Sequence, residues 1–257
     1  MNNSLVSGSH PLPTLDIVPV PMLRPFKWLW LGAQDLRKSW GPSLGYGALT
    51  VAMGWTLLVF CATHPYYVAA AISGFLLVGP PMSAGLCEIS RRFSQGMPSS
   101  FDNSMEGFAR HRDSLFAFGS ILSACAVGWF VLSGVILKTV FAVAAPDMRE
   151  TLYRGFLDSA NRDQILAYLI IGGLLAVSVF AVSVVAIPLI IDRGATAGQA
   201  IRTSLRATFT NVPAMIIWSG MILLLTAVGY ASLLLGLLLV VPLLGHATWY
   251  AYKDMVR

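Results

Sequence analysis

The chain has 257 residues, of which 56% are hydrophobic and only 11% are charged, and its mean hydropathy is +0.70. Soluble domains carry about 25% charged residues, so this composition excludes an ordinary soluble protein. The high apolar content also excludes intrinsic disorder. The composition therefore predicts a polytopic membrane protein, and the position of its net charge of +5 relative to the membrane bears on the topology.

The N-terminal segment differs in composition from the rest of the chain. Its first twenty residues contain Pro11, Pro13 and Pro19 and no basic start before an apolar stretch, so they do not form a signal peptide. We expect residues 1–24 to form a flexible cytoplasmic tail and residues 25–257 to form a single polytopic membrane domain.

The uncharged stretches of the sequence determine how many times the chain crosses the membrane. The 49 residues between Lys38 and Glu88 carry no charge. As one helix they would be about 73 Å long, more than twice a hydrocarbon core of about 30 Å. His64-Pro65 is the expected break between two helices. The 46 uncharged residues before Lys253 are also too long for one helix, and we expect their turn at residues 229–232.

We therefore predict an all-α membrane protein with six transmembrane helices, arranged as three hairpins. The predicted helices cover about 45–63, 66–86, 115–137, 165–191, 212–228 and 233–250. A five-crossing alternative joins the last two into one long, tilted helix. With six crossings, 13 Lys and Arg residues share one side with both termini and 4 lie on the other side. The positive-inside rule then places both termini in the cytoplasm.

Each predicted hairpin is preceded by a segment whose apolar residues repeat at helical spacing. Phe26, Leu29, Leu36 and Trp40 show this pattern in the first segment, and residues 101–115 and 197–212 show it in the other two. Such segments are typical of basic amphipathic helices in the cytoplasmic interface. The three units are either internal repeats or independent hairpins, because any membrane hairpin needs a polar segment before it.

The sequence offers little for catalysis. The histidines His10, His64, His111 and His246 fall at different positions relative to the membrane, and the three cysteines lack C-x-x-C spacing. The sequence contains no metal-ligand motif, glycine-rich phosphate loop or recognisable Ser-His-acid arrangement. We therefore expect no enzymatic activity, no catalytic residue, no metal site, no cofactor and no nucleic-acid partner.

Polar residues near the predicted cytoplasmic helix ends are the remaining candidates for binding, because ionisable groups near a bilayer are often functional. The candidate binding residues are Glu88, Arg91, Arg92, Asp192, Arg193, Asn211, His246, Tyr250 and Asp254. The alternative is that they are separate, solvated loop residues. For Glu88 and Arg92, four residues apart, the simplest interpretation is an exposed pair at a helix end.

The segment 245–254 is the most distinctive run. On a helix, His246, Tyr250 and Asp254 share one face, and Trp249 and Lys253 share another. The first face could bind a head group or a partner; alternatively, the segment is an aromatic anchor at the membrane interface. Four other tryptophans fit the same aromatic belt, namely Trp28, Trp30, Trp40 and Trp218, and we expect Trp55 to pack within the protein.

Four strings of the sequence carry a family resemblance: residues 42–47, 73–80, 88–92 and 245–254. They resemble an uncharacterised proteobacterial integral-membrane family known as domain of unknown function 2189, over about residues 26–257. Cys87 stands where an aromatic residue is usual, and Tyr250 stands where histidine is usual. The resemblance implies an inner-membrane location and no established activity. Some members are labelled as cytochrome oxidase subunits, but this chain lacks the converging histidines that haem-copper chemistry requires.

These observations lead to two functional hypotheses. The first is a non-catalytic component of the bacterial inner membrane that binds lipids and partners or organises the membrane. It would contact anionic head groups at the cytoplasmic face, with a membrane-protein partner or a second copy of the chain as further candidates. The second is a small transporter or channel with a path between the hairpins.

Overall fold

The computed structural model describes residues 15–63, 82–141 and 162–257. These residues form an all-α fold, and residues 82–94 form a helix that follows the first gap. The other helices, in chain order, are α1 (Arg24–Lys38), α2 (Trp40–Thr63), α4 (Phe101–Arg110), α5 (Arg112–Phe141), α7 (Arg162–Ser183), α8 (Ala186–Arg193), α9 (Ala197–Thr210), α10 (Val212–Ala231) and α11 (Leu237–Met255).

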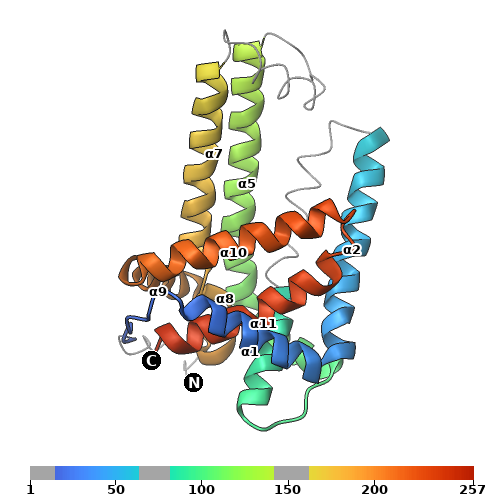
Figure 1. Ribbon diagram of the computed structural model, residues 1–257, viewed down its shortest axis with the longest axis vertical. Helices are drawn as coiled ribbons and strands as arrows, with labels where there is room; N and C mark the ends of the chain where they lie inside the picture. The colour runs from blue at the N-terminus through green and yellow to red at the C-terminus, as the bar shows by residue number, and fades with distance from the viewer. Residues whose placement is uncertain (1–14, 64–81, 142–161) are drawn as a thin grey trace, which may run out of the picture.

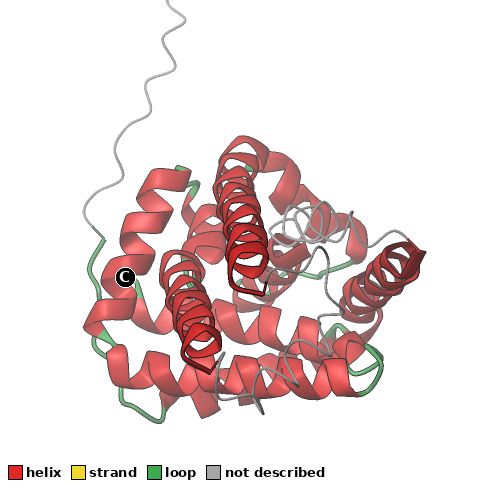
Figure 2. Cartoon of the chain, turned by 90° about the horizontal axis from the view of Figure 1, so that it is seen from above, coloured by secondary structure: helices red, strands yellow, loops and turns green. Residues whose placement is uncertain are grey.

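The helices have two orientations. Figure 1 shows α2, α5 and α7 running along the long axis, whereas α1, α8, α9 and α11 gather across one end of the molecule. Figure 2, which looks along that axis, shows the long helices end-on above this layer. We call the layer of α1, α8, α9, α11 and residues 82–94 the basal layer. It contains most of the polar side chains discussed below.

Three segments of the described chain are long and apolar enough to cross a membrane: Trp40–Val59, Ile170–Arg193 and Val212–Ala231. Their outward side chains are apolar and exposed, as in Leu58 (55%), Leu174 (64%) and Leu223 (73%). Such surfaces are typical of helices in lipid. However, α10 and α11 lie across the long axis rather than along it (Figure 1). The six-span hairpin arrangement is therefore not confirmed, and most of the predicted span 66–86 lies outside the described residues.

Separate helices precede α2, α5 and α10, as the apolar spacing predicted, and their start signals are visible. In α9 the Thr196 side chain accepts a hydrogen bond from the Gln199 backbone N–H, and the Gln199 side chain accepts one from the Thr196 backbone. This capping box satisfies two free donors of the first turn. The turn between α10 and α11 comes later than predicted, since α10 continues to Ala231 and α11 begins at Leu237. Within this turn Leu233 and Leu234 adopt positive φ angles of 54° and 69°.

Helix α1 packs lengthwise and antiparallel against α11 at the centre of the basal layer. Asp254 contacts the start of α1, and Ala247 approaches Gly32 in its middle. A Cβ at Gly32 would lie 2.7 Å from the Ala247 backbone nitrogen, so only glycine allows the two backbones to approach this closely. The antiparallel pair therefore brings the beginning and the end of the described chain together.

The residues before α1 are fixed against the C-terminus. Ile17 and Val256 form an antiparallel β-bridge, and the Val20 N–H donates to Asn211 Oδ1 at 2.7 Å. Residues 15–20 therefore do not form the free tail predicted from composition. Residues 1–14 lie outside the described residues.

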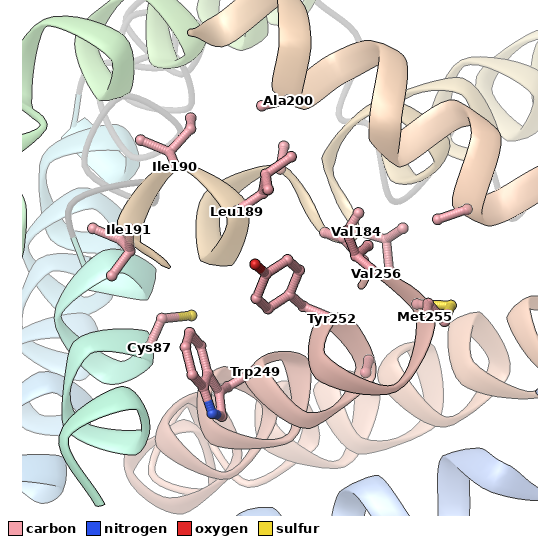
Figure 3. Close-up of a cluster of buried hydrophobic side chains, with 14 of the residues drawn as sticks. Cys87, Val184, Leu189, Ile190, Ile191, Ala200, Trp249, Tyr252, Met255 and Val256 are labelled. Atoms are coloured by element: carbon pink, nitrogen blue, oxygen red, sulfur yellow. The ribbon is translucent and has the colours of Figure 1, made fainter. Parts of the chain in front are cut away.

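The basal layer has its own apolar core. Figure 3 shows Leu189 and Ile191 of α8 facing Trp249 and Tyr252 of α11, with Cys87 beside the indole. All five are at most 1% exposed. On the other side of α11, Trp28 of α1 meets Trp218 of α10 edge to face, with ring centroids 5.8 Å apart. This geometry is favourable for aromatic pairs.

These contacts revise the predicted aromatic belt. Trp28 and Trp218 are fully buried and Trp249 is 1% exposed, so all three are core residues rather than interface anchors. Trp30 and Trp40 are more than half exposed, whereas Trp55, expected to pack inside, is 43% exposed on α2. The residue type and its position in the sequence suggested tryptophans at the interface. Which indoles are buried depends on helix packing, which the sequence pattern does not show.

We predict that Gly32→Ala lowers the free energy of unfolding in detergent by about 1–3 kcal/mol, because the new methyl group overpacks the contact between α1 and α11. Gly41→Ala is the matched control, since a Cβ there meets nothing within 4 Å. It should be neutral or stabilise by up to about 1 kcal/mol. Equal effects of both variants in chemical denaturation would contradict the close packing.

Candidate functional site

A buried ring of five polar side chains lies where four helical segments meet. Its members are Asp35 of α1, Ser39 between α1 and α2, Ser43 of α2, Ser90 of residues 82–94 and His246 of α11. None is more than 4% exposed. We call this set the polar ring.

Hydrogen bonds connect the ring without a gap. His246 lies between two serines, with Nδ1 2.8 Å from Ser90 Oγ and Nε2 2.9 Å from Ser43 Oγ. Ser90 also contacts Asp35 Oδ2 at 2.8 Å. The circuit closes through Ser39, whose Oγ lies 2.8 Å from Ser43 Oγ and 2.7 Å from the Asp35 carbonyl oxygen.

Two further groups reach the Asp35 carboxyl. The Tyr250 hydroxyl donates to Oδ2 at 2.8 Å, and Lys38 Nζ lies 4.0 Å from Oδ1. Burial raises the pKa of Asp35, and the hydrogen bonds from Tyr250 and Ser90 and the charge of Lys38 offset only part of that rise. The protonated form is therefore favoured relative to an exposed aspartate.

A second cluster surrounds Glu88, whose side chain is fully buried. Arg91 donates to both carboxylate oxygens at 2.7 Å, and Arg92 Nε donates to Oε1 at 3.1 Å. Arg92 also pairs with Glu106 of α4 at 2.6 Å. Gly107 of α4 covers the carboxylate, since a Cβ there would lie 3.0 Å from Oε2. Glu88 is therefore a buried structural ion pair, which corrects the expectation of an exposed pair at a helix end.

The C-terminal end of α11 holds a third polar contact. Asp254 accepts hydrogen bonds from Arg24 Nε at 2.6 Å and from Trp28 Nε1 at 2.7 Å. Burial opposes ionisation of Asp254, but these bonds and the Arg24 charge hold its pKa below the ordinary value. The same pairing raises the pKa of Arg24. This contact fixes the start of α1 to the end of α11.

The remaining candidate residues also face neighbouring helices. Asp192 accepts from the Tyr252 hydroxyl at 2.7 Å and lies 3.5 Å from Lys253 Nζ and 4.0 Å from Arg193 Nε. Burial and the Asp192 charge raise the pKa of Tyr252. Asn211 caps the connection between α9 and α10, where it contacts the segment before α1 through the Val20 N–H and the Val18 carbonyl.

The predicted helical face of α11 is correct, but it points inward. His246, Tyr250 and Asp254 all contact α1 or the start of α2, whereas Lys253 faces Asp192 on the other side. Four members of the polar ring, Asp35, Ser39, Ser43 and Ser90, were not among the residues predicted from the sequence. One signal was present, since Asp35, Ser39 and Ser43 repeat every four residues and so form one polar stripe. His246 and Ser90 come from distant parts of the chain, so the Ser-His-Ser-Asp sequence of contacts has no linear motif.

Among the described residues, no group of three or more His, Cys, Asp or Glu side chains could hold a metal ion. The polar ring contains only one imidazole and one carboxyl, and its atoms are already within hydrogen-bond distance of one another. Proton exchange is the chemistry that this arrangement supports.

Comparison with models of known protein families gives a match to part of the chain. Residues 68–192 match the model of a family described as a predicted integral membrane protein, DUF2189. This match confirms the resemblance seen in the sequence and supports a membrane location. The DUF2189 match includes Glu88, Ser90 and Asp192 but ends before α9, α10 and α11. Among curated proteins and solved structures, no match to the chain was found.

The Glu88 cluster in the DUF2189 segment yields a second prediction. Glu88→Gln should lower the free energy of unfolding by about 3–5 kcal/mol, because it leaves two largely buried guanidinium groups without their shared carboxylate. Glu106→Gln removes a carboxylate that is 55% exposed from the same Arg92 and should cost less than about 1 kcal/mol. Denaturant titration of both variants in detergent measures the difference, and similar losses would contradict a buried pair.

Proposed function

We propose that this chain is a non-catalytic component of the bacterial inner membrane that binds anionic lipid head groups at its cytoplasmic face. The observation that carries the proposal is the unequal placement of charge. Among the residues whose exposure the structure describes, half of the carboxylates are buried or partly buried, whereas most of the basic side chains are exposed to the surroundings.

The inward carboxylates are held within the basal layer. Asp35 and Glu88 are buried, and Asp192 and Asp254 are partly buried against neighbouring helices. Glu88, Asp192 and Asp254 pair with basic side chains, and burial favours the protonated form of Asp35. These four groups therefore contribute little negative charge to the surface. An ion-coupled transporter needs carboxylates that are free to bind the ion. Glu88 and Asp192 already bind side chains of this chain, which favours lipid binding over ion coupling.

Most described basic residues are exposed. They are Lys27, Arg37, Lys38, Arg110, Arg112, Arg202, Arg206, Lys253 and Arg257, against the exposed acidic residues Asp16, Asp102, Glu106 and Asp113. They lie on or beside α1, α4, α5, α9 and α11. Each basic residue near an anionic leaflet contributes on the order of 1 kcal/mol to binding. The excess of basic groups therefore fits a surface of anionic lipid.

The membrane topology in this proposal has both termini in the cytoplasm. The bridge between Ile17 and Val256 supports it, because ends that pair directly lie on one side of the membrane and require an even number of crossings. The excess of Lys and Arg on the segments that share this side then selects the cytoplasm. Six crossings satisfy this parity, whereas the five-crossing alternative does not.

The test uses the full chain in nanodiscs of phosphatidylcholine with or without phosphatidylglycerol. Phosphatidylglycerol should raise the Tm at low salt, and added salt should reduce this gain. Lys27→Gln with Arg37→Gln should lower the lipid-dependent stabilisation by about 2 kcal/mol, since two exposed charges are removed.

The control removes charge of the opposite sign from the exposed surface. Asp102→Asn with Asp113→Asn should preserve or increase the gain from phosphatidylglycerol. A Tm that is insensitive to anionic lipid and salt would contradict the proposal. Equal loss of the lipid effect in both double variants would contradict it as well.

A further inference from the structure

The polar ring contains more hydrogen-bond contacts than its ordinary protonation state can supply with hydrogens. Five contacts of 2.7 to 2.9 Å join Asp35, Ser90, His246, Ser43 and Ser39 in a circuit. Every contact needs one hydrogen between its two heavy atoms. Each serine hydroxyl supplies one hydrogen, and a neutral imidazole supplies one ring N–H. With Asp35 ionised and His246 neutral, the ring has four hydrogens for five contacts.

The contacts themselves show where the deficit would fall. If Ser90 donates to Asp35 and Ser39 donates to the Asp35 carbonyl, both hydroxyl hydrogens are used. His246 must then donate to Ser90 through Nδ1, and Ser43 has one hydrogen for its two contacts. If Ser43 donates to Ser39, the contact between Ser43 Oγ and His246 Nε2 is left as two lone pairs at 2.9 Å; if it donates to Nε2, the 2.8 Å contact with Ser39 is left in the same state. An unsatisfied contact of this kind is costly when both groups are buried.

We propose that the polar ring is a binding site for one proton, which Asp35 and His246 share through Ser90. The added proton supplies the missing fifth hydrogen. The inference does not depend on lipid binding, because it rests on side chains inside the basal layer.

The proton resides on the Asp35 carboxyl near neutral pH. Asp35 Oδ2–H then donates to Ser90, Ser90 donates to His246 Nδ1, and His246 Nε2–H donates to Ser43. Ser43 donates to Ser39, and Ser39 donates to the Asp35 carbonyl, so all five contacts are satisfied with both titratable groups neutral. Transfer moves the Asp35 proton to Ser90 while the Ser90 hydrogen passes to Nδ1, which leaves a carboxylate and an imidazolium.

The surroundings favour the neutral pair over the separated charges. An imidazolium and a carboxylate would both lose hydration in a region where neither side chain exceeds 1% exposure. The charged group closest to the carboxyl is Lys38, at 4.0 Å, and its side chain is 62% exposed, so water weakens its effect. Tyr250 donates to Oδ2 and favours the carboxylate, but together with Ser90 and Lys38 it offsets only part of the effect of burial.

The proton links the helices from which the ring is built. Its loss leaves one contact unsatisfied at the junction of α1, α2, α11 and residues 82–94. In the unfolded chain, aspartate and histidine have pKa values of about 3.9 and 6.5, so neither holds a proton at alkaline pH. The folded protein then binds more protons than the unfolded chain, and stability falls as the pH rises. The decline begins above about pH 6.5, where unfolded histidine is neutral, and ends at the pH at which the ring releases its proton.

Infrared spectroscopy of the full chain in detergent tests the location of the proton. At neutral pH the protein should show the C=O absorption of a protonated carboxylic acid in a buried site. Asp35→Asn should abolish this band. Asp254→Asn is the control and should leave the band intact, because the pairing of Asp254 with Arg24 keeps that carboxyl ionised. A spectrum without the band, or a band that persists in Asp35→Asn, would overturn the proposal.

Thermal denaturation at a series of pH values gives an independent test of the proton count. The amide that Asp35→Asn introduces donates permanently to Ser90, so this variant should fold and its Tm should not fall between about pH 7 and pH 9. In the wild type, the unfolding equilibrium constant should rise by up to tenfold per pH unit over the pH range in which stability declines, because unfolding releases one proton. The same pH dependence in both proteins would exclude Asp35 as the proton-binding group.

Discussion

The packing of α1 against α11 is the constraint on which the rest of the basal layer depends. It brings Gly32 against Ala247, places Asp254 at the start of α1, and lets Ile17 pair with Val256. The same helix pair aligns His246 and Tyr250 with Asp35 and Ser43. A chain with long apolar helices thus has its beginning and its end joined in one polar layer, rather than emerging separately from the membrane.

This layer also separates two roles that charge has in the protein. Carboxylates turned inward bind arginine, lysine, tyrosine, tryptophan or serine partners and hold helices together, as Glu88 does with two arginines. Among the residues whose exposure the structure describes, exposed basic side chains outnumber exposed acidic ones, so these outer faces present net positive charge. The proposed attraction to anionic lipid follows from the distribution of charge in the fold rather than from the modest net charge alone.

Much of the fold was predictable because apolar length and helical spacing are local properties. The sequence predicted an all-α membrane protein, a helix before each of α2, α5 and α10, and the shared face of His246, Tyr250 and Asp254. It did not predict that this face points toward α1, because that depends on a close approach at Gly32. The spacing of apolar and polar residues along a helix also cannot show that α10 lies across the long axis, or that Trp28, Trp218 and Trp249 are buried.

The candidate site was less predictable for the same reason. Glu88 and Asp192 stood out as charges beside apolar runs, whereas Ser39 and Ser43 are marked only by their four-residue spacing from Asp35, and Ser90 has no distinguishing local pattern. Tyr250 reaches Asp35, and His246 reaches Ser43, across more than 200 positions of the sequence. Such a network becomes visible only when tertiary contacts are known. Asp35 was the available clue, as an acidic residue in register with the two serines.

Cysteine cross-linking in intact bacterial membranes tests the closure of the chain most directly. In a variant whose native Cys61, Cys87 and Cys125 are replaced, Ile17→Cys with Val256→Cys should form a disulfide readily, because paired positions of this bridge lie within bonding reach. The control is Ile17→Cys with Leu235→Cys. It should not form a disulfide, because Leu235 precedes the N-terminus of α11 whereas Val256 follows its C-terminus. Failure of the first pair to cross-link, together with labelling of its two thiols from opposite sides of the membrane, would contradict the account.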